Sequence, residues 1–321
     1  MINTSKLTKR FGDFTAVDAL DLDIGEGEVF GLLGPNGAGK TTTISMLITL
    51  VEPTTGKARV NGFDVVTQKA DVRKSIGIVF QEPSVDDLLT GRENLEMHAR
   101  LYSMPQGIRE SRISEALELV ELTERANSFV KTYSGGMRRR LELARGLLHR
   151  PKVMFLDEPT LGLDPQTREH IWTFIRRLAK EENMTILLTT HYMEEADLLC
   201  SRIGIIDSGK IRALGSPRKL KHQVGGDLVV IRQKGFDPKS IRALPFVSKV
   251  SQDGAEVTLS VKDAHKNMQK LLAKIGSIDS VEVREASLTD VFLKYTGKKF
   301  REESGEGDWS DRVMHQVNVR G

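Results

Sequence analysis

The chain has 321 residues, of which 39% are hydrophobic and 28% charged, so it can bury a large core and is not a disordered chain. This length suits one large α/β domain followed by a smaller domain. A net charge of +3 gives no compositional case for nucleic-acid binding, and we interpret the basic runs Arg138–Arg140 and Lys298–Lys299 as solvated faces.

Membrane and redox signals are weak in this sequence. The single cysteine, Cys200, cannot form an internal disulfide, which fits a reducing cytosol and argues against a structural zinc site. The amino-terminal residues are polar and lack the apolar segment of a signal peptide. Because no stretch of about 18 apolar residues occurs, we expect any membrane contact to come through another polypeptide.

Short apolar runs alternate with amphipathic helical patterns over residues 1–215, which predicts a mostly parallel sheet covered by helices. Three runs lack polar alternation and are expected to be central strands, namely residues 29–33, 153–156 and 185–190. Each runs directly into a polar cluster. Ligands of open α/β sheets bind beyond the carboxyl ends of the strands, so this edge is a candidate site.

The alternation stops over residues 82–132, where helices are expected at 91–102 and 109–122 as a helical insertion. A boundary is expected at residues 216–226, followed by a small α+β domain over residues 227–297. Its strands are expected at 227–233, 246–250, 256–261 and 280–286, and its helices at 263–275 and at 287–296 after a cap at Ser287. The polar residues 298–321 are expected to form a mobile tail.

Residues 34–42 read GPNGAGKTT and fit the phosphate-loop pattern through Gly34, Gly39, Lys40 and Thr41. Glycines let successive backbone N–H groups face one anion, and the helix that starts here directs its positive end to the same place. The lysine adds a full charge for the β- and γ-phosphates, and the threonine hydroxyl can bind Mg²⁺. The alternative is a glycine-rich turn without a ligand.

Asp157 and Glu158 follow the second buried strand, and His191 follows the third. One carboxylate there can hold Mg²⁺ beside Thr41, while its neighbour can orient and deprotonate an attacking water. The alternative interpretation is a surface turn. His191 is placed to reach a γ-phosphate, or is an undistinguished polar residue at a strand end.

The stretch Tyr133–Met137, YSGGM, followed by RRRLELARGLL, resembles the signature motif of ATP-binding-cassette (ABC) proteins. Other motifs of that family appear in order: Gln81 after GIVF resembles the glutamine loop, VMFLDEP the Walker B strand, LGLD at 161–164 the D-loop, and TTHYMEEAD the histidine switch. Phe11 occupies the position of the aromatic ring that stacks on adenine. The resemblance covers residues 2–220 and implies a P-loop ABC ATPase core over 1–220, with an antiparallel β subdomain.

The family chemistry is carried over residue by residue. The resemblance implies that Glu158 is the general base, that His191 contacts the γ-phosphate, and that Thr41, Gln81 and Asp157 surround Mg²⁺. The residues expected to bind ATP are Phe11, Val17, Asn36, Gly37, Ala38, Gly39, Lys40, Thr41, Thr42, Ser134, Gly135, Gly136 and Asp164. Ser134 and Gly136 should contact ATP held by a second protomer, so that a homodimer encloses two ATP molecules.

Departures from the usual motifs point to a subgroup. Met137 replaces the usual glutamine of the signature and Tyr133 the usual leucine, while Phe11 replaces the commoner tyrosine. The signature form and the ending REASLTDVFLKYTGK resemble daunorubicin-resistance and multidrug-resistance export ATPases. Residues 227–297 are then a regulatory or assembly module, or alternatively a packing appendage.

These resemblances imply a Mg²⁺-dependent ATPase subunit that powers an exporter, with a separately encoded permease docking on residues 82–132. It is expected to be cytoplasmic and peripheral on the membrane, without nucleic acid. The alternative is a soluble ABC ATPase that serves ribosomes, DNA repair or cofactor assembly. Ribosome-type members usually carry two cassettes, and this chain has one. A non-hydrolysing binder is disfavoured by Glu158. The cargo stays open among drug, lipid, polysaccharide and ion.

Overall fold

A computed structural model describes residues 1–82, 84–225, 227–232, 239–254, 256–262, 264–275, 279–284 and 286–297. The tail predicted at 298–321 lies outside these described residues. Within the described part of the chain, no helix combines the length and apolar character needed to cross a bilayer.

A six-stranded sheet in the order β10-β9-β3-β8-β7-β6 forms the centre of the large domain. Its strands are β3 (Val29–Leu33), β6 (Ile76–Val79), β7 (Val153–Asp157), β8 (Thr185–Thr190), β9 (Arg202–Asp207) and β10 (Lys210–Gly215). All neighbouring pairs are parallel except β10 with β9. The three predicted central strands are confirmed as β3, β8 and β7. They lie side by side and are buried along their whole length, so their carboxyl ends meet at one edge.

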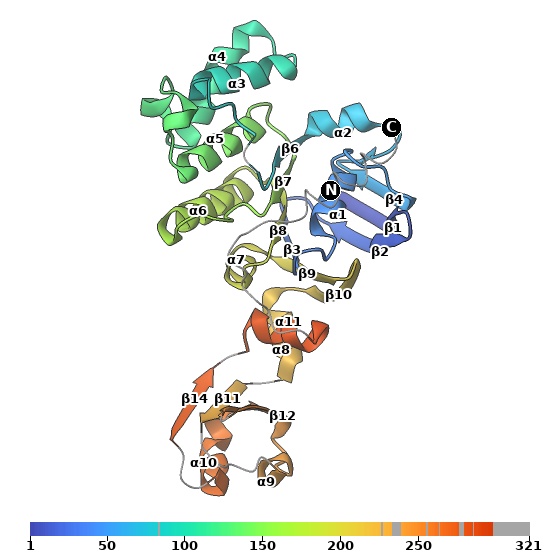
Figure 1. The fold of residues 1–321 in the computed structure, drawn as a ribbon, viewed down its shortest axis with the longest axis vertical. Helices are drawn as coiled ribbons and strands as arrows, with labels where there is room; N and C mark the ends of the chain where they lie inside the picture. Colours follow the sequence, from blue (N-terminus) through green and yellow to red (C-terminus); the bar gives the residue numbers. More distant parts are fainter. Residues whose placement is uncertain are drawn as a thin grey trace.

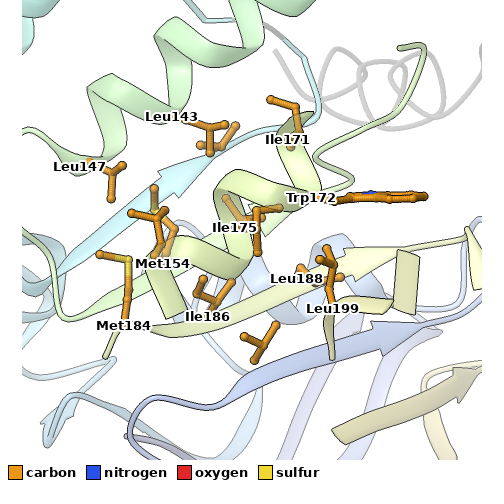
Figure 2. Close-up of a cluster of buried hydrophobic side chains, with 14 of the residues drawn as sticks. Leu143, Leu147, Met154, Ile171, Trp172, Ile175, Met184, Ile186, Leu188 and Leu199 are labelled. Carbon is orange, nitrogen blue, oxygen red and sulfur yellow. The ribbon is translucent and has the colours of Figure 1, made fainter. Parts of the chain in front are cut away.

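Each face of the central sheet is covered. On one face, Met154 of β7 and Ile186 of β8 pack against Ile171 and Ile175 of α6 (Pro165–Glu181), as Figure 2 shows. Phe155, the next residue of β7, belongs to a second apolar cluster on the other face, together with α1 (Lys40–Leu47). This alternation follows the pleat of a strand that is buried on both sides.

An antiparallel sheet in the order β2-β1-β4-β5 shares the second cluster with α1, which confirms the expected antiparallel subdomain. Its strands are β1 (Ile2–Phe11), β2 (Phe14–Ile24), β4 (Thr55–Val60) and β5 (Phe63–Asp64). The helix α2 (Lys69–Ser75) leads from this sheet to β6. Figure 1 shows the antiparallel strands beside α1, at the opposite side of the central sheet from α6.

The helical insertion comprises α3 (Gly91–Leu101) and α4 (Gln106–Leu119), followed by α5 (Gly135–Leu147). The second helix, predicted at 109–122, begins and ends three residues earlier, directly after Pro105 and at Leu119. Tyr133 is buried in this region and its hydroxyl donates to the carbonyl of Arg125 at 2.6 Å. The unusual signature tyrosine therefore anchors the insertion.

Residues 216–226, predicted as a boundary, contain a helix, α8 (Pro217–Gly225). Beyond it the sheet β12-β13-β11-β14 forms, with α10 (Ala264–Ile275) contributing to its core. The bounds are β11 (Asp227–Arg232), α9 (Lys239–Arg242), β12 (Val247–Asp253), β13 (Glu256–Val261) and β14 (Ser280–Arg284). The predicted strands and helices of this region are confirmed to within a few residues, and the short α9 is additional.

The apolar side chains of the last helix, α11 (Leu288–Thr296), pack on the large domain, while Asp290 in its first turn forms an ion pair with Arg284 of β14 at 2.6 Å. Its side chains Leu288, Val291 and Phe292 join the apolar cluster of the large domain, which also contains Leu220 of α8. Figure 1 shows α11 beside α8, between the small sheet and β10. The cap predicted at Ser287 is confirmed, since Ser287 and Asp290 form a reciprocal capping box.

Candidate active site

The phosphate loop links β3 to α1 and has no room for a side chain at Gly34 or Gly39. At Gly39, where φ is +106°, a Cβ atom would lie 2.5 Å from the carbonyl oxygen of Ala16. Val17 of β2 lies behind the same glycine and is fully buried, and Ala38 is buried beside it. Asn36 and Gly37, at the outer side of the loop, are exposed. The loop backbone is thus packed from behind and open in front.

Lys40 begins α1 and is only 5% exposed. Its ammonium group donates to the carbonyl oxygens of Gly34 at 2.8 Å and Pro35 at 3.2 Å, and it forms an ion pair with Glu158 at 3.2 Å. The first turn of α1 contains no acidic residue. The positive end of the helix and the lysine charge therefore act together on whatever anion enters the loop.

Asp157 ends β7 and is buried. Its carboxylate accepts hydrogen bonds from the hydroxyls of Thr189 and Thr41. Burial raises the pKa of Asp157 above its ordinary value, although both hydroxyls and the charge of Lys40 oppose this shift. A buried carboxylate next to an exposed threonine hydroxyl is a hard-oxygen donor set of the kind that Mg²⁺ prefers.

Glu158, the next residue, adopts a left-handed backbone conformation with φ +48°. Its carboxylate contacts Lys40 on one oxygen and Nδ1 of His191 on the other, at 3.0 Å. Burial favours the neutral acid, but the hydrogen bond from His191 and the charge of Lys40 more than offset it, so the pKa of Glu158 is lowered. The carboxylate is therefore held ionised, as a proton acceptor must be.

The signature residues lie apart from their own phosphate loop. Ser134 caps the amino end of α5, with its hydroxyl accepting a hydrogen bond from the backbone N–H of Met137 at 3.2 Å. The nearest atoms to a Cβ at Gly135 and Gly136 belong to Leu163 and Thr167.

Asp164 is exposed, and its carboxylate caps α6 by accepting from the backbone N–H of Thr167 at 2.9 Å. The signature and the D-loop thus form one exposed surface at the amino ends of α5 and α6.

Two of the other expected site residues are exposed at strand ends. Phe11 ends β1 with 45% of its side chain exposed, and the ammonium of Lys9 lies 4.9 Å from its ring centre. Gln81 follows β6 and is exposed. Because β6 pairs in parallel with β7, Gln81 lies at the same edge of the sheet as Asp157. The structure thus brings Lys40, Thr41, Asp157, Glu158 and His191 together and leaves the aromatic ring and the glutamine at the rim.

Sequence reasoning missed one buried ion pair and one buried carboxylate beside this site. The first is Arg139 with Glu142, both on α5, so the interpretation of Arg138–Arg140 as a solvated face is wrong for Arg139. The other is Glu195 on α7 (Met193–Leu199), which accepts hydrogen bonds from Thr160 and from the indole of Trp172, each at 2.9 Å. Burial raises the pKa of Glu195, although hydrogen bonds from Thr190, Trp172 and Thr160 oppose this shift. The sequence signal that could have identified Glu195 was its position on the apolar face of the short helix α7.

Comparison with known proteins gives consistent matches over both parts of the chain. A family model described as ABC transporter matches residues 17–161, and one described as ATP-binding protein DrrA1-3-like, C-terminal domain, matches residues 215–296. The linearmycin resistance ATP-binding protein LnrL of Bacillus subtilis is 38% identical over 312 residues, covering 94% of this chain and 100% of that protein. The daunorubicin resistance ATP-binding protein DrrA2 of Streptomyces coeruleorubidus is 41% identical over 308 residues, covering 93% and 95%.

The fold is also similar to solved structures. A dimeric ATP-binding cassette in a post-hydrolysis state, bound to ADP and Pi, superposes with a TM-score of 0.61 at 29% sequence identity. The match covers 67% of this chain and 98% of that cassette. The ABC ATPase architecture expected from the sequence motifs is therefore confirmed.

Proposed function

Because this chain belongs to the ATP-hydrolysing subunits of ABC exporters of the DrrA daunorubicin-resistance type, we propose that Lys40, Glu158 and His191 form its hydrolytic centre. The observation that carries this assignment is the contact of both Lys40 and His191 with one buried, ionised carboxylate, 3.2 and 3.0 Å away. Lys40 begins α1, Glu158 follows β7 and His191 follows β8, and the three side chains meet at the front of the phosphate loop.

In the proposed reaction a water molecule attacks the γ-phosphorus of ATP. A new P–O bond forms, the bond to the bridging oxygen of ADP breaks, and Glu158 accepts the proton that the water loses. Lys40 leaves its ion pair to bind the β- and γ-phosphates, and His191 contacts the γ-phosphate while holding the carboxylate of Glu158.

The backbone of Asn36, Gly37, Ala38 and Gly39, with Thr42, completes the phosphate contacts. The ring of Phe11 supplies a stacking face for adenine, whereas Val17, fully buried behind Gly39, supports the loop from behind rather than facing the nucleotide as expected.

Mg²⁺ fits the donors at this site. Thr41 and Asp157 present hydroxyl and carboxylate oxygens that already contact each other, and Gln81 can add an amide oxygen from the rim. When bound, the ion would neutralise charge on the β- and γ-phosphates. A cation at this position also relieves the cost of keeping the buried carboxylate of Asp157 ionised.

A second copy of the chain is proposed to complete each site. Ser134, Gly135, Gly136 and Asp164 form an exposed surface, and Ser134 starts a 13-residue helix whose positive end faces outward. An anion held by another protomer suits that surface. The similar cassette, solved as a dimer bound to ADP and Pi, supports dimerisation. In the proposed homodimer, ATP lies between the phosphate loop of one copy and the signature of the other.

We also propose a separately encoded membrane permease as the partner of residues 82–132. Large apolar side chains are exposed there, with Leu88 76% and Leu101 73% accessible, as expected for a surface that a partner covers. The subunit would then lie at the cytoplasmic face of the membrane, touching it only through the permease. Names of relatives that refer to linearmycin and daunorubicin resistance favour a toxic compound as cargo.

The test is Mg²⁺-dependent ATP hydrolysis by the purified protein, wild type against Glu158→Gln, with mass followed by light scattering. We expect the substitution to lower kcat by about 10²–10⁴-fold, the usual contribution of a general base, and to yield an ATP-dependent dimer. Glu28→Gln is the matched control, since Glu28 pairs with Arg202 at the amino end of β3. Equal turnover by wild type and Glu158→Gln, with both proteins monomeric, would reject the proposed role of Glu158.

A further inference from the structure

A buried arginine on α5 lies behind the proposed hydrolytic centre without belonging to it. Arg139 is 7% exposed, and its partner Glu142, one helical turn later, is fully buried. The neighbouring arginines on the same helix are more exposed than Arg139, with 27% of each side chain exposed at Arg138 and Arg140. Burial lowers the pKa of Arg139, and the charge of Glu142 opposes that shift, as expected of a buried ion pair whose desolvation is costly.

The guanidinium of Arg139 donates hydrogen bonds to backbone carbonyls at the carboxyl ends of two neighbouring strands, β7 and β6. Nε donates to the carbonyl of Pro159 at 2.7 Å, and Nη2 donates to those of Glu158 at 3.0 Å and Asp157 at 3.2 Å. Nη1 donates to the carbonyl of Phe80, the residue before the glutamine loop. One side chain thus donates to the last carbonyl of β7, to the two carbonyls after it, and to the carbonyl that follows β6.

Glu142 extends this contact to the segment behind the glutamine loop. One carboxylate oxygen accepts from Arg139 at 3.1 Å. The other accepts from the backbone N–H of Ser84 at 2.6 Å and from its hydroxyl at 3.2 Å. Arg145 donates to the carbonyl of the same serine at 2.7 Å. The helix that begins with the signature, α5, therefore binds the segment that follows β7 and the backbone on both sides of Gln81.

Only a planar, multiply donating cation can make this set of contacts. Arginine offers five N–H donors in a rigid fork, whereas the ammonium of lysine offers three from one point. The backbone it holds is unfavourable on its own, because Glu158 has φ +48° and a non-glycine residue pays about 1–3 kcal/mol for such a conformation. Hydrogen bonds to the carbonyls on either side stabilise that turn.

We propose that Arg139 is a positioning residue for ATP hydrolysis: it fixes the backbone that aims Glu158, and it ties this backbone to the glutamine loop and to the signature helix. This inference rests on the proposed role of Glu158 as the proton acceptor. The residue contacts no phosphate-loop group in the structure's described hydrogen bonds, so it acts on the orientation of the base rather than on ATP binding.

The test compares Arg139→Lys with wild type and with Arg140→Lys. Arg140 is the matched control, since it lies on the same helix but donates to the carbonyl of Val120 in the helical insertion. We expect Arg139→Lys to lower kcat by about tenfold or more, because small misplacements of a catalytic group are costly. ATP KM and the Kd for ATP without Mg²⁺ should stay within about twofold of wild type, and Arg140→Lys should match wild type in both.

The proposal is overturned if Arg139→Lys keeps wild-type kcat, or if its affinity for ATP falls as far as kcat does. Should Arg139→Lys not fold, Glu142→Gln replaces it, since the neutral amide loosens the same arginine. A fall in kcat at constant KM supports the proposal, and wild-type kcat rejects it. Full turnover by Glu158→Gln would refute the proposed role of the base itself, which separates that failure from the failure of Arg139.

Discussion

The substitution Glu158→Gln is expected to tighten ATP binding in the absence of Mg²⁺, apart from its effect on turnover. The ammonium of Lys40 is paired with the Glu158 carboxylate at 3.2 Å, and both side chains are buried, at 5% and 7% exposure. ATP binding requires the lysine to turn from this carboxylate to a phosphate. Glutamine keeps the shape of the side chain and removes the competing charge.

The magnitude follows from the distance. Two unit charges 3.2 Å apart attract by about 5 kcal/mol at an effective dielectric constant of about 20, the value that suits such sites. If a quarter to a half of this attraction is lost when ATP enters, binding to wild type is weakened by about 1.3–2.6 kcal/mol, or roughly 10- to 80-fold. The repulsion between Glu158 and the γ-phosphate acts in the same direction.

The assay is titration calorimetry of ATP into monomeric protein with EDTA present, so that neither metal nor hydrolysis contributes. Glu28→Gln removes the carboxylate of the Arg202 pair, 3.1 Å long, at the far end of β3, and should leave the Kd unchanged. Equal or weaker binding by Glu158→Gln, with an unchanged control, would show that the ion pair does not compete with ATP.

Three further substitutions test other parts of the structure. Phe292→Ala should lower the unfolding free energy by about 3–5 kcal/mol, since Phe292 is 1% exposed where α11 meets the large domain; urea denaturation measures this, and a loss under about 1 kcal/mol contradicts the packing. Gly39→Ala should abolish ATP binding in calorimetry, because the added Cβ meets the carbonyl of Ala16 at 2.5 Å and φ is +106°; near-normal affinity would refute this. The folded-state pKa of Glu195 is raised, so its contribution to stability is complete below its ordinary pKa of 4.5 and is lost as pH rises through the folded value. Glu195→Gln cannot titrate, so the stability of the variant relative to wild type, measured by urea denaturation, should increase as the pH rises above about 4.5; a constant difference would contradict the shift.

Much of the fold could be predicted because its strongest signals are local. The apolar runs at residues 29–33 and 185–190 coincide with β3 and β8, and the run at 153–156 with β7. Continuous apolar residues are required of strands that are buried on both faces. Because parallel neighbours end at one edge, the residues that follow them had to meet. The proximity of Lys40, Glu158 and His191 therefore followed from sequence pattern plus one topological rule.

The basic stretch at 216–226 shows what local reasoning leaves out. Glycine and proline near its ends predicted a boundary, and residues 217–225 form a helix that was not predicted, α8, which packs with α11 from the far end of the chain. Residues 287–296 were predicted as a helix with the right cap, while their packing against the large domain could not be read from periodicity. A helical stripe indicates that a face is buried, without saying which element covers it.

The sequence alone determined the class of the large domain, the phosphate loop and the family, because these depend on residue types at short, fixed spacings. Only the tertiary structure decided which partners the buried charges find. Arg139 donates to the carbonyls of Phe80 and Glu158, which lie 59 and 19 residues away in the sequence. Lys40 forms an ion pair with the carboxylate of Glu158, which follows β7. Such pairings depend on how packed elements align in space, since desolvated charges must be compensated by whatever polar groups the fold brings within reach.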